Sequence, residues 1–436
     1  MTDWTLSELE SWDKKICKIA KKYNLDWFEI DYEICDYYDM IGNMTYVGMP
    51  SHYKHWSYGK NFERTHYFYN MGLEGLPYEM IINSDPSISY LMRQNSMYMH
   101  ILTMAHCVGH SDFFKNNVTF KNTDPQNVIS KFKNAADRIR TYMEDPSIGA
   151  AAVEKILDSA HSIKFQCDRY LIKTDDPKTL KSKFLKKVRE ADSDLDPDFN
   201  LEKIPLEFDY NILAFISRYS RHLEDWERDV LEIVREEANY FIPQARTKIM
   251  NEGWASFWHY TILQELNLPQ EYYIPFLKSH NQVIRPHIGG INPYHLGFQI
   301  FMKIKEEHGL EECFLAREIH NDESFLRMYL DCSLCQELNL FSYALKKSDY
   351  VVDEISDIDG WKKVRENLIS EIALNSIPSI YVEELIKEDH SLILRHEFDG
   401  RELELEYAEN VCFHIKDLWR DNVRLFTIIE EEEWEM

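Results

Sequence analysis

Two groups of residues in this sequence carry side chains that could bind a metal ion. His106 and His110 are four residues apart, so on an α-helix they lie on one face, one turn apart. Far downstream, Glu252 and His259 are seven residues apart, which is two helical turns, and they also share a face. Two imidazoles at this spacing and a carboxylate from a second helix form a typical zinc-ligand set. The sequence therefore predicts a site for zinc, or for another divalent metal, at His106, His110 and Glu252. His259 would be a fourth ligand or a partner that orients a ligand.

The same residues also have a purely structural interpretation. Two histidines at this spacing arise by chance, and core histidines bonded to the backbone or to an aspartate would look the same. A metal site also requires the predicted helices over 97–115 and 244–266 to meet, although about 140 residues separate His110 from Glu252. The sequence alone does not show this contact.

Glu79 is the first candidate for an additional functional carboxylate. It stands among apolar neighbours in a stretch, 76–83, whose pattern indicates a strand. A carboxylate buried there needs a hydrogen bond, an ion pair or a metal. We therefore expect Glu79 to act as a catalytic base or to support the metal ligands.

The downstream motif resembles one of the gluzincin peptidases, in which two histidines on one helix and a glutamate on a following helix bind zinc. The aminopeptidase branch places that glutamate in an Asn-Glu-Gly-aromatic-Ala context, and residues 251–256 (NEGWAS) are similar. Zincins also carry a glutamate directly after the first histidine as general base, and here that residue is Cys107. Three alternatives follow. The base comes from Glu79, Asp112 or Glu63, the metal works without a carboxylate base, or the site is structural or regulatory.

Five stretches of the chain resemble the SpoVR family (stage V sporulation protein R). They are residues 48–53 (GMPSHY), 75–80 (GLPYEM), 82–86 (INSDP), 106–117 (HCVGHSDFFKNN) and 251–259 (NEGWASFWH). The resemblance extends over nearly the whole chain. It implies a role in forming the spore cortex, which is peptidoglycan, and protein partners such as a PrkA-type serine kinase and a YeaH/YhbH-type protein. It implies no settled chemistry. Two functions therefore stay open, a zinc-dependent peptidase-like or amidase-like hydrolase without the usual glutamate base, and a non-catalytic regulator or scaffold.

Composition narrows the classes of protein that fit. Of the 436 residues 44% are hydrophobic and 28% charged, which is ordinary for a soluble globular protein. The net charge of -26 argues against binding nucleic acid or anionic lipid through a basic surface. The sequence contains no apolar run long enough for a membrane span and no signal-peptide pattern. Its eight cysteines are scattered, so we expect reduced thiols in a cytoplasmic protein.

The apolar periodicity predicts a mainly α, large N-terminal domain followed by a small α+β C-terminal domain. The expected parts are a helical region with the histidine pair over 1–172, a charged linker or insertion over 173–200, a helical region of the same body with the second motif over 201–344, and the α+β domain over 345–436.

Several local predictions concern turns and chain ends. We expect a helix over 85–93, a helix break near Pro243, a turn-rich crossing over 269–290, a hairpin at Asp399-Gly400 that joins strands over 391–398 and 403–407, and a frayed tail over 430–436. The aromatic segment around His52 and His55 is interpreted as packing on the body rather than as a second metal site.

Overall fold

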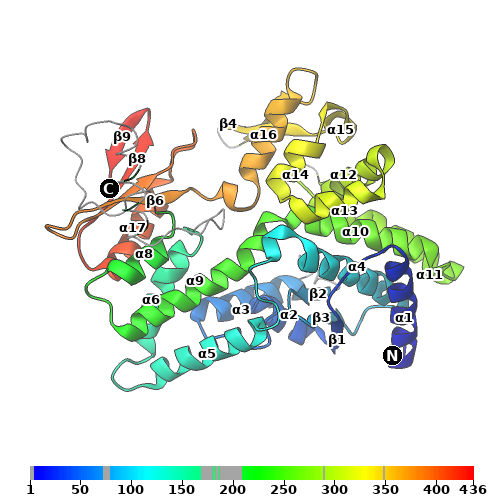
Figure 1. The fold of residues 1–436 in the computed structure, drawn as a ribbon, viewed down its shortest axis with the longest axis horizontal. Coiled ribbons are helices and arrows are strands. Elements are labelled where there is room, and N and C mark those ends of the chain that lie inside the picture. Colours follow the sequence, from blue (N-terminus) through cyan, green and yellow to red (C-terminus); the bar gives the residue numbers. More distant parts are fainter. Residues whose placement is uncertain are drawn as a thin grey trace. The chain divides into compact units, whose positions relative to one another are not determined.

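The computed structural model describes residues 4–71, 79–167, 209–287, 290–346 and 349–436, together with the single positions 179, 182 and 186. The chain forms two compact units, and each combines two separate segments (Figure 1). Unit 1 consists of Met1–Ala136 and Pro243–Asn375, and unit 2 of Asp137–Ile242 and Ser376–Met436. The predicted linker over 173–200 lies outside the described residues except at the single positions. The four-part division predicted from the sequence stays a prediction.

Unit 1 is built around three buried helices. They are α4 (Met97–Asn116), α10 (Lys248–Glu265) and α12 (Pro293–His308), and α10 packs against both of the others. α4 is buried along nearly its whole length. A helix that is buried on every face lies in the protein interior, so its three histidines, His100, His106 and His110, lie in the core. The helices predicted over 97–115 and 244–266 are confirmed, with small shifts at their ends.

Glycines determine how closely these helices approach one another. A Cβ atom on Gly253 of α10 would lie 2.4 Å from backbone atoms of Gly297 on α12, and one on Gly109 of α4 would lie 2.7 Å from the Cα atom of Ala255. Non-bonded carbon atoms normally stay about 3.5–4.0 Å apart. Only glycine therefore fits at these contacts, which lie directly beside the candidate metal ligands in the sequence.

Further helices and a small sheet surround this core. α1 (Leu6–Lys22) and α11 (Gln270–Val283) pack on α4, and α13 (Leu310–Ile319) packs on α12 and α4. The sheet has the order β1-β3-β2, with β3 parallel to β1 and antiparallel to β2. Its strands and the neighbouring short helices are β1 (Ile30–Cys35), β2 (Glu79–Ile82), β3 (Ser87–Met92), α2 (Tyr37–Thr45), α3 (Trp56–Asn70) and η1 (Val118–Phe120).

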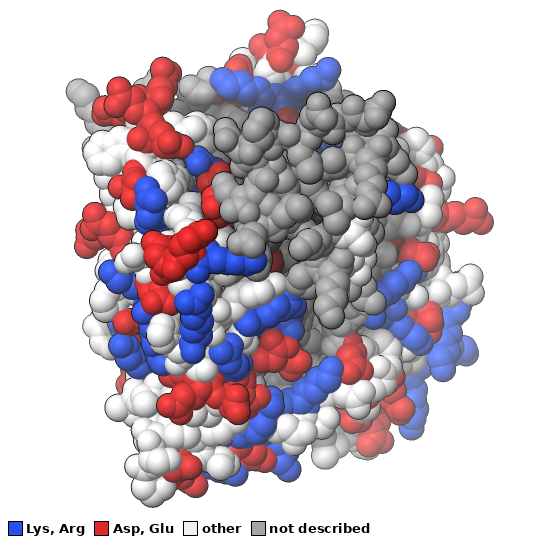
Figure 2. Space-filling view, turned by 60° about the vertical axis from the view of Figure 1, so that its left-hand side comes forward, with Lys and Arg blue, Asp and Glu red and all other residues white. Residues whose placement is uncertain are grey.

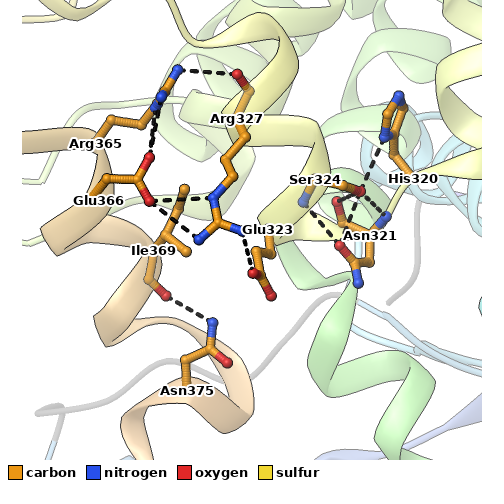
Figure 3. Close-up of polar contacts among 9 residues, drawn as sticks. All are labelled: His320, Asn321, Glu323, Ser324, Arg327, Arg365, Glu366, Ile369 and Asn375. Atoms are coloured by element: carbon orange, nitrogen blue, oxygen red, sulfur yellow. Dashed lines mark hydrogen bonds and ion pairs between the residues drawn. The ribbon is translucent and has the colours of Figure 1, made fainter. Parts of the chain in front are cut away.

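The last part of unit 1 follows α13. It contains α14 (Asp322–Tyr329), α15 (Cys332–Glu337), the hairpin of β4 (Phe341–Lys346) and β5 (Asp349–Ile355), and α16 (Trp361–Glu371). Arg327 of α14 donates to the Glu366 carboxylate of α16 at 3.2 Å, and Arg365 of α16 donates to the backbone oxygen of Arg327 at 3.0 Å (Figure 3). These bonds join α14 to α16. They matter for the site because α14 in turn contacts α10.

Unit 2 contains a four-stranded sheet of order β6-β7-β8-β9, in which only the central β7–β8 pair is parallel. Its described elements are α6 (Ala150–Ile163), α8 (Ile212–Tyr219), β6 (Ile380–Leu385), β7 (Leu392–His396), α17 (Leu405–Trp419), β8 (Val423–Ile429) and β9 (Glu432–Glu435). The helices α5 (Val128–Glu144) and α9 (Asp225–Arg246), and the short η2 (Ala373–Ser376), each contain a point at which the units divide. The predicted fold class, mainly α with a small α+β C-terminal part, is confirmed.

Two local predictions in unit 1 are wrong, and a third is displaced along the chain. Residues 87–92 form the strand β3 rather than a helix, because β3 has a strand partner on each side. The helix break predicted near Pro243 lies at Thr247, between the end of α9 at Arg246 and the start of α10. Residues 270–283 form α11 instead of a turn-rich crossing, with Pro275 inside the helix.

Two predictions near the C-terminus are also wrong. Residues 405–407 begin α17, because the Glu404 side chain accepts the backbone N–H of Tyr407 and caps the helix. No hairpin forms at Asp399-Gly400, because β7 pairs in parallel with the later strand β8. The acidic tail is ordered as β9, an edge strand antiparallel to β8.

The cysteines agree with the sequence-based expectation of free thiols. All eight cysteines are free thiols. On the face drawn in Figure 2, acidic and basic side chains lie interspersed among uncharged ones. Within the described residues, no helix is both long enough and apolar enough to cross a membrane.

Candidate metal site

His106 and His110 of α4 lie side by side in the core of unit 1. His106 is 3% exposed and His110 is 6% exposed. Their rings meet edge to face, with centroids 4.5 Å apart, as expected one helical turn apart. Both rings therefore present nitrogen atoms to the same side of the helix.

The carboxylate of Glu252 on α10 faces the two imidazoles. Its Oε2 atom lies 3.7 Å from His106 Nε2 and 3.4 Å from His110 Nε2. The ligand atoms of the three residues lie within 4.8 Å of one another. In the part of the chain that the structure describes, no other group of three or more His, Cys, Asp or Glu side chains converges in this way. The helices that the sequence could not show to meet are in contact, and the glycine contact between Gly109 and Ala255 allows it.

The Nδ1 atom of each imidazole, on the ring side away from Glu252, has a polar partner of its own. His110 Nδ1 donates to Asn251 Oδ1 at 2.8 Å, which leaves the Nε2 lone pair facing Glu252. His106 Nδ1 lies 2.9 Å from His259 Nδ1, and His259 Nε2 lies 2.7 Å from His280 Nδ1 on α11. Such partners fix the orientation and tautomer of a ligand imidazole. Both ring nitrogens of His259 are occupied by contacts with His106 and His280, so the geometry favours an orienting role for His259 over direct metal ligation.

The charges of the three residues are strongly coupled. Burial lowers the pKa of His110, but its polar contact with Glu252 and the charge of that carboxylate outweigh burial, so the net pKa of His110 is raised. Burial lowers the pKa of His106 to about 4, with a contribution from His110, so this imidazole is neutral and can act as a ligand. Burial raises the pKa of Glu252, but the two imidazoles outweigh burial and hold that pKa well below its usual range. The Oε2 atom of the resulting carboxylate is buried and has no hydrogen-bond partner. A divalent metal ion between this oxygen and the two ring nitrogens would take the place of the protons that the three residues otherwise share.

Glu79 reaches the same site from the sheet. β2 holds it opposite Leu91 of β3, and its Oε1 atom lies 3.9 Å from His106 Nε2. Burial, which outweighs the neighbouring His110, raises the pKa of the Glu79 carboxyl to about 7. A cavity of about 290 Å³ opens beside Glu79, His110 and Glu252. A carboxyl with this pKa is suited to accept and donate protons near neutral pH.

Cys107, at the position of the zincin base, does not line this cavity. Its Sγ atom lies 3.2 Å from Ser89 Oγ on β3. Burial, together with the nearby Glu79, raises the pKa of the thiol well above its usual range, so it stays protonated. The thiol is therefore packed between α4 and the sheet and cannot act as a base in the cavity.

The other two candidate bases also lie outside the cavity. Asp112 is fully buried and accepts hydrogen bonds from Trp254 Nε1 and from the backbone N–H of Asp26, both at 2.8 Å. Arg317 lies 3.5 Å from the same carboxylate. Asp112 thus joins α4 to α10 and to the chain before β1. Glu63 is exposed on α3.

Several residues of the site were not identified from the sequence. Tyr294 lines the cavity, and its ring stacks 6.1 Å from the ring of His106. Burial, with the charges of Glu252 and Glu79, raises the pKa of its phenol well above the usual range, so the phenol keeps its proton. His280 had no local signal, because it becomes relevant only through contact with His259.

The segment with His52 and His55 packs as an aromatic cluster. The His52 ring stacks on Tyr46 with centroids 5.7 Å apart and meets Tyr58 edge to face at 4.8 Å. His55 accepts the backbone N–H of Ser57 and caps α3. The packing interpretation of this segment is therefore the better one.

The fold and the site together define a mainly helical protein with a buried cluster of two histidines and one glutamate. Comparison with known proteins identifies the family of this chain. Residues 3–377 match the family described as SpoVR like protein, and residues 378–430 match the SpoVR-like C-terminal domain. The chain belongs to the SpoVR family, as the five stretches predicted. A relative from Escherichia coli (strain K12), the uncharacterized protein YcgB, is 33% identical over 475 residues, covering 97% of this chain and 92% of that protein. No solved structure matches.

Proposed function

We propose that His106, His110 and Glu252 bind one divalent metal ion, zinc in view of the ligand set, and that the protein uses this site to hydrolyse amide bonds during spore cortex formation. The observation that carries the proposal is the buried Glu252 Oε2 atom, which has no hydrogen-bond partner and faces two oriented imidazole nitrogens. A cation between these atoms would remove the cost of an unpaired buried carboxylate. His259 and Asn251 would hold the ligand rings in place.

The chain's own residues can supply the proton transfers. Bound zinc supplies a Lewis acid that polarises a carbonyl group and favours ionisation of water. In the proposed reaction Glu79 accepts a proton from the attacking water, whose oxygen bonds to the carbonyl carbon. The C–N bond then breaks, and Glu79 gives the proton to the leaving nitrogen, so that one carboxylic acid and one amine form. Tyr294 would donate a hydrogen bond to the carbonyl oxygen as charge develops on it.

Elemental analysis of the purified protein tests the metal site. We expect one equivalent of zinc in the wild type and loss of it in both His106→Ala and Glu252→Ala. His52→Ala, in the aromatic cluster, is the matched control and should keep the metal. Circular dichroism would verify that each variant folds. A wild-type protein that takes up no metal even after zinc loading would refute the proposal.

Turnover is tested separately with Glu79→Gln. This variant should keep its zinc and lose amide hydrolysis by about 10²–10⁴-fold, the usual effect of removing a general base. Glu63→Gln, an exposed change on α3, should hydrolyse like the wild type. Full activity in Glu79→Gln would exclude Glu79 as the base.

A second candidate function is a non-catalytic regulator or scaffold that acts through partners such as a PrkA-type kinase and a YeaH/YhbH-type protein. The observation that favours it is Cys107, a protonated thiol packed away from the cavity at the position where zincins carry their base. A cell that lacks the protein and receives a His106→Ala copy separates the two functions. Restored cortex would support the scaffold, and a persistent cortex defect, with normal levels of the variant, would support the metal site.

A further inference from the structure

The lining of the cavity beside the candidate metal site combines two kinds of charged residue. Glu79, His110 and Glu252 belong to the proposed reaction site. The lining also includes Lys248 and Gln244, which offer N–H donors and a positive charge. An acidic reaction site with a cationic neighbour suits a ligand that carries its own negative charge.

Lys248 is placed to meet such a charge. It stands one turn before Glu252 on α10, so both side chains project from the same face of the helix. Lys248 is exposed and lines the cavity, and its charge also acts on the buried Asp322 carboxyl. Its ammonium group can therefore meet a ligand in the cavity.

The partial positive charge at the N-terminus of α10 is not available to a ligand in the cavity. At the N-terminus of α10 the backbone N–H groups of Ile249 and Met250 donate to the two carboxylate oxygens of Asp322, each at 2.9 Å. Asp322 is buried and occupies the place where an anion would otherwise bind. Among the residues that line the cavity, Lys248 carries the ammonium group that can meet an anionic ligand, and Gln244, four residues earlier in the sequence, offers an amide N–H.

The size and walls of the cavity narrow the ligand further. Its volume of about 290 Å³ is at the lower end of the range of ~300–1,000 Å³ for small-molecule sites. Met80, Ile81 and Phe114 form apolar parts of the wall. One helical turn, the separation between Glu252 and Lys248 along α10, is about 5.4 Å. An extended polypeptide advances about 3.3–3.6 Å per residue, so this separation corresponds to one or two residues of substrate. These dimensions fit the end of a peptide better than the middle of a long strand.

We propose that the substrate is a peptide with a free C-terminal carboxylate one or two residues beyond the bond that is cleaved, and that Lys248 binds this carboxylate. This inference rests on the proposed amide hydrolysis at the same site. Water adds to the carbonyl carbon, the C–N bond breaks, and the leaving nitrogen takes the proton. The products are a shortened peptide with a new carboxylate and a free amino acid or dipeptide. An apolar residue at the C-terminus would contact Met80 and Phe114.

Binding measurements test the role of Lys248 without turnover. Isothermal titration of an N-acetylated dipeptide ending in leucine compares its free acid with its C-terminal amide, on metal-free protein and on the zinc-loaded Glu79→Gln variant. The free acid should bind roughly fivefold more tightly at low salt, the range of a solvent-exposed charge pair, and high salt should reduce the difference. Lys248→Met should abolish this preference and Lys248→Arg should keep it. Lys278→Met, an exposed change on α11, is the control and should bind like the wild type.

The outcomes separate this inference from the metal proposal. A preference for the free acid on metal-free protein, lost in Lys248→Met, would support the carboxylate site even if no zinc binds. Equal binding of acid and amide, or an unchanged preference in Lys248→Met, would overturn it even if zinc binds as proposed. Phenyl phosphate serves as the competing anion. Tighter binding of phenyl phosphate than of the free-acid peptide would overturn a carboxylate substrate in favour of a phosphate ligand.

Discussion

The contact between α10 and α12 leads to a specific prediction for Gly253→Ala. The added Cβ atom would lie 2.4 Å from the Cα atom and the carbonyl carbon of Gly297, and 2.9 Å from its carbonyl oxygen. All three are backbone atoms, so no side chain can rotate away. Restoring a contact of about 3.5 Å requires the two helices to separate by roughly 1 Å at this point.

Two opposing effects determine the size of the change. Overpacking a core costs about 1–3 kcal/mol, and a clash with backbone belongs at the upper end of that range. Alanine gains about 0.8–1.0 kcal/mol over glycine inside a helix. We therefore expect Gly253→Ala to lower the free energy of unfolding by about 2 kcal/mol. Because Glu252 is the preceding residue, the displacement of α10 should also weaken zinc binding.

Urea unfolding followed by circular dichroism measures the effect. Gly42→Ala in α2 is the matched control, because nothing lies within 4 Å of its added Cβ atom. This control should raise the free energy of unfolding by about 0.5–1 kcal/mol. If Gly253→Ala unfolds at the wild-type urea concentration or above it while Gly42→Ala behaves as expected, the packing argument is refuted.

Three further predictions concern buried polar groups. Burial raises the pKa of Asp322 from 3.8 to about 7. Between these two pH values the folded state holds a proton that the unfolded state has released. The contribution of Asp322 to the free energy of unfolding is therefore fully present below about pH 4 and is lost as the pH rises through 7. Asp322→Asn should flatten the fall in urea midpoint between about pH 4 and pH 7, and an unchanged fall would contradict this. Arg317→Met should cost about 3–5 kcal/mol, because it leaves the buried Asp112 without its cation. Urea unfolding of Asp112→Asn/Arg317→Met checks the cause, since the double variant should regain most of the loss. His259→Ala should weaken zinc binding about 10–100-fold, because His106 loses its orienting partner. Competition with a chelator measures this, and unchanged affinity would exclude the orienting role.

Local periodicity was sufficient to identify the elements that carry the site. The spacing of His106 and His110 predicted one face of one helix, and the run from Asn251 to His259 predicted another. Both predictions hold because four- and seven-residue steps keep side chains on one helical face whatever the helix packs against. Glu79 was singled out for a similar reason, since a carboxylate among apolar residues needs a partner wherever the strand lies.

The local predictions that failed depend on partners distant in the sequence. Residues 87–92 form a strand because β1 and β2 lie on either side of it, and no local pattern contains that information. The turn at Asp399-Gly400 resembles a hairpin, but β7 takes a parallel partner that follows α17. Pairing between distant strands is decided by the packing of the whole unit, which overrides local propensity.

The sequence by itself determined which residue types are available, which faces they share and the family to which the chain belongs. Only the tertiary structure decided that α4 meets α10, that Glu79 faces the histidines while Cys107 faces away, and that His259 lies behind His106. The physical reason is that backbone contact at glycines such as Gly109 and Gly253 sets the distance between helices. That distance, rather than any spacing along the chain, brings the nitrogen and oxygen atoms of the site together.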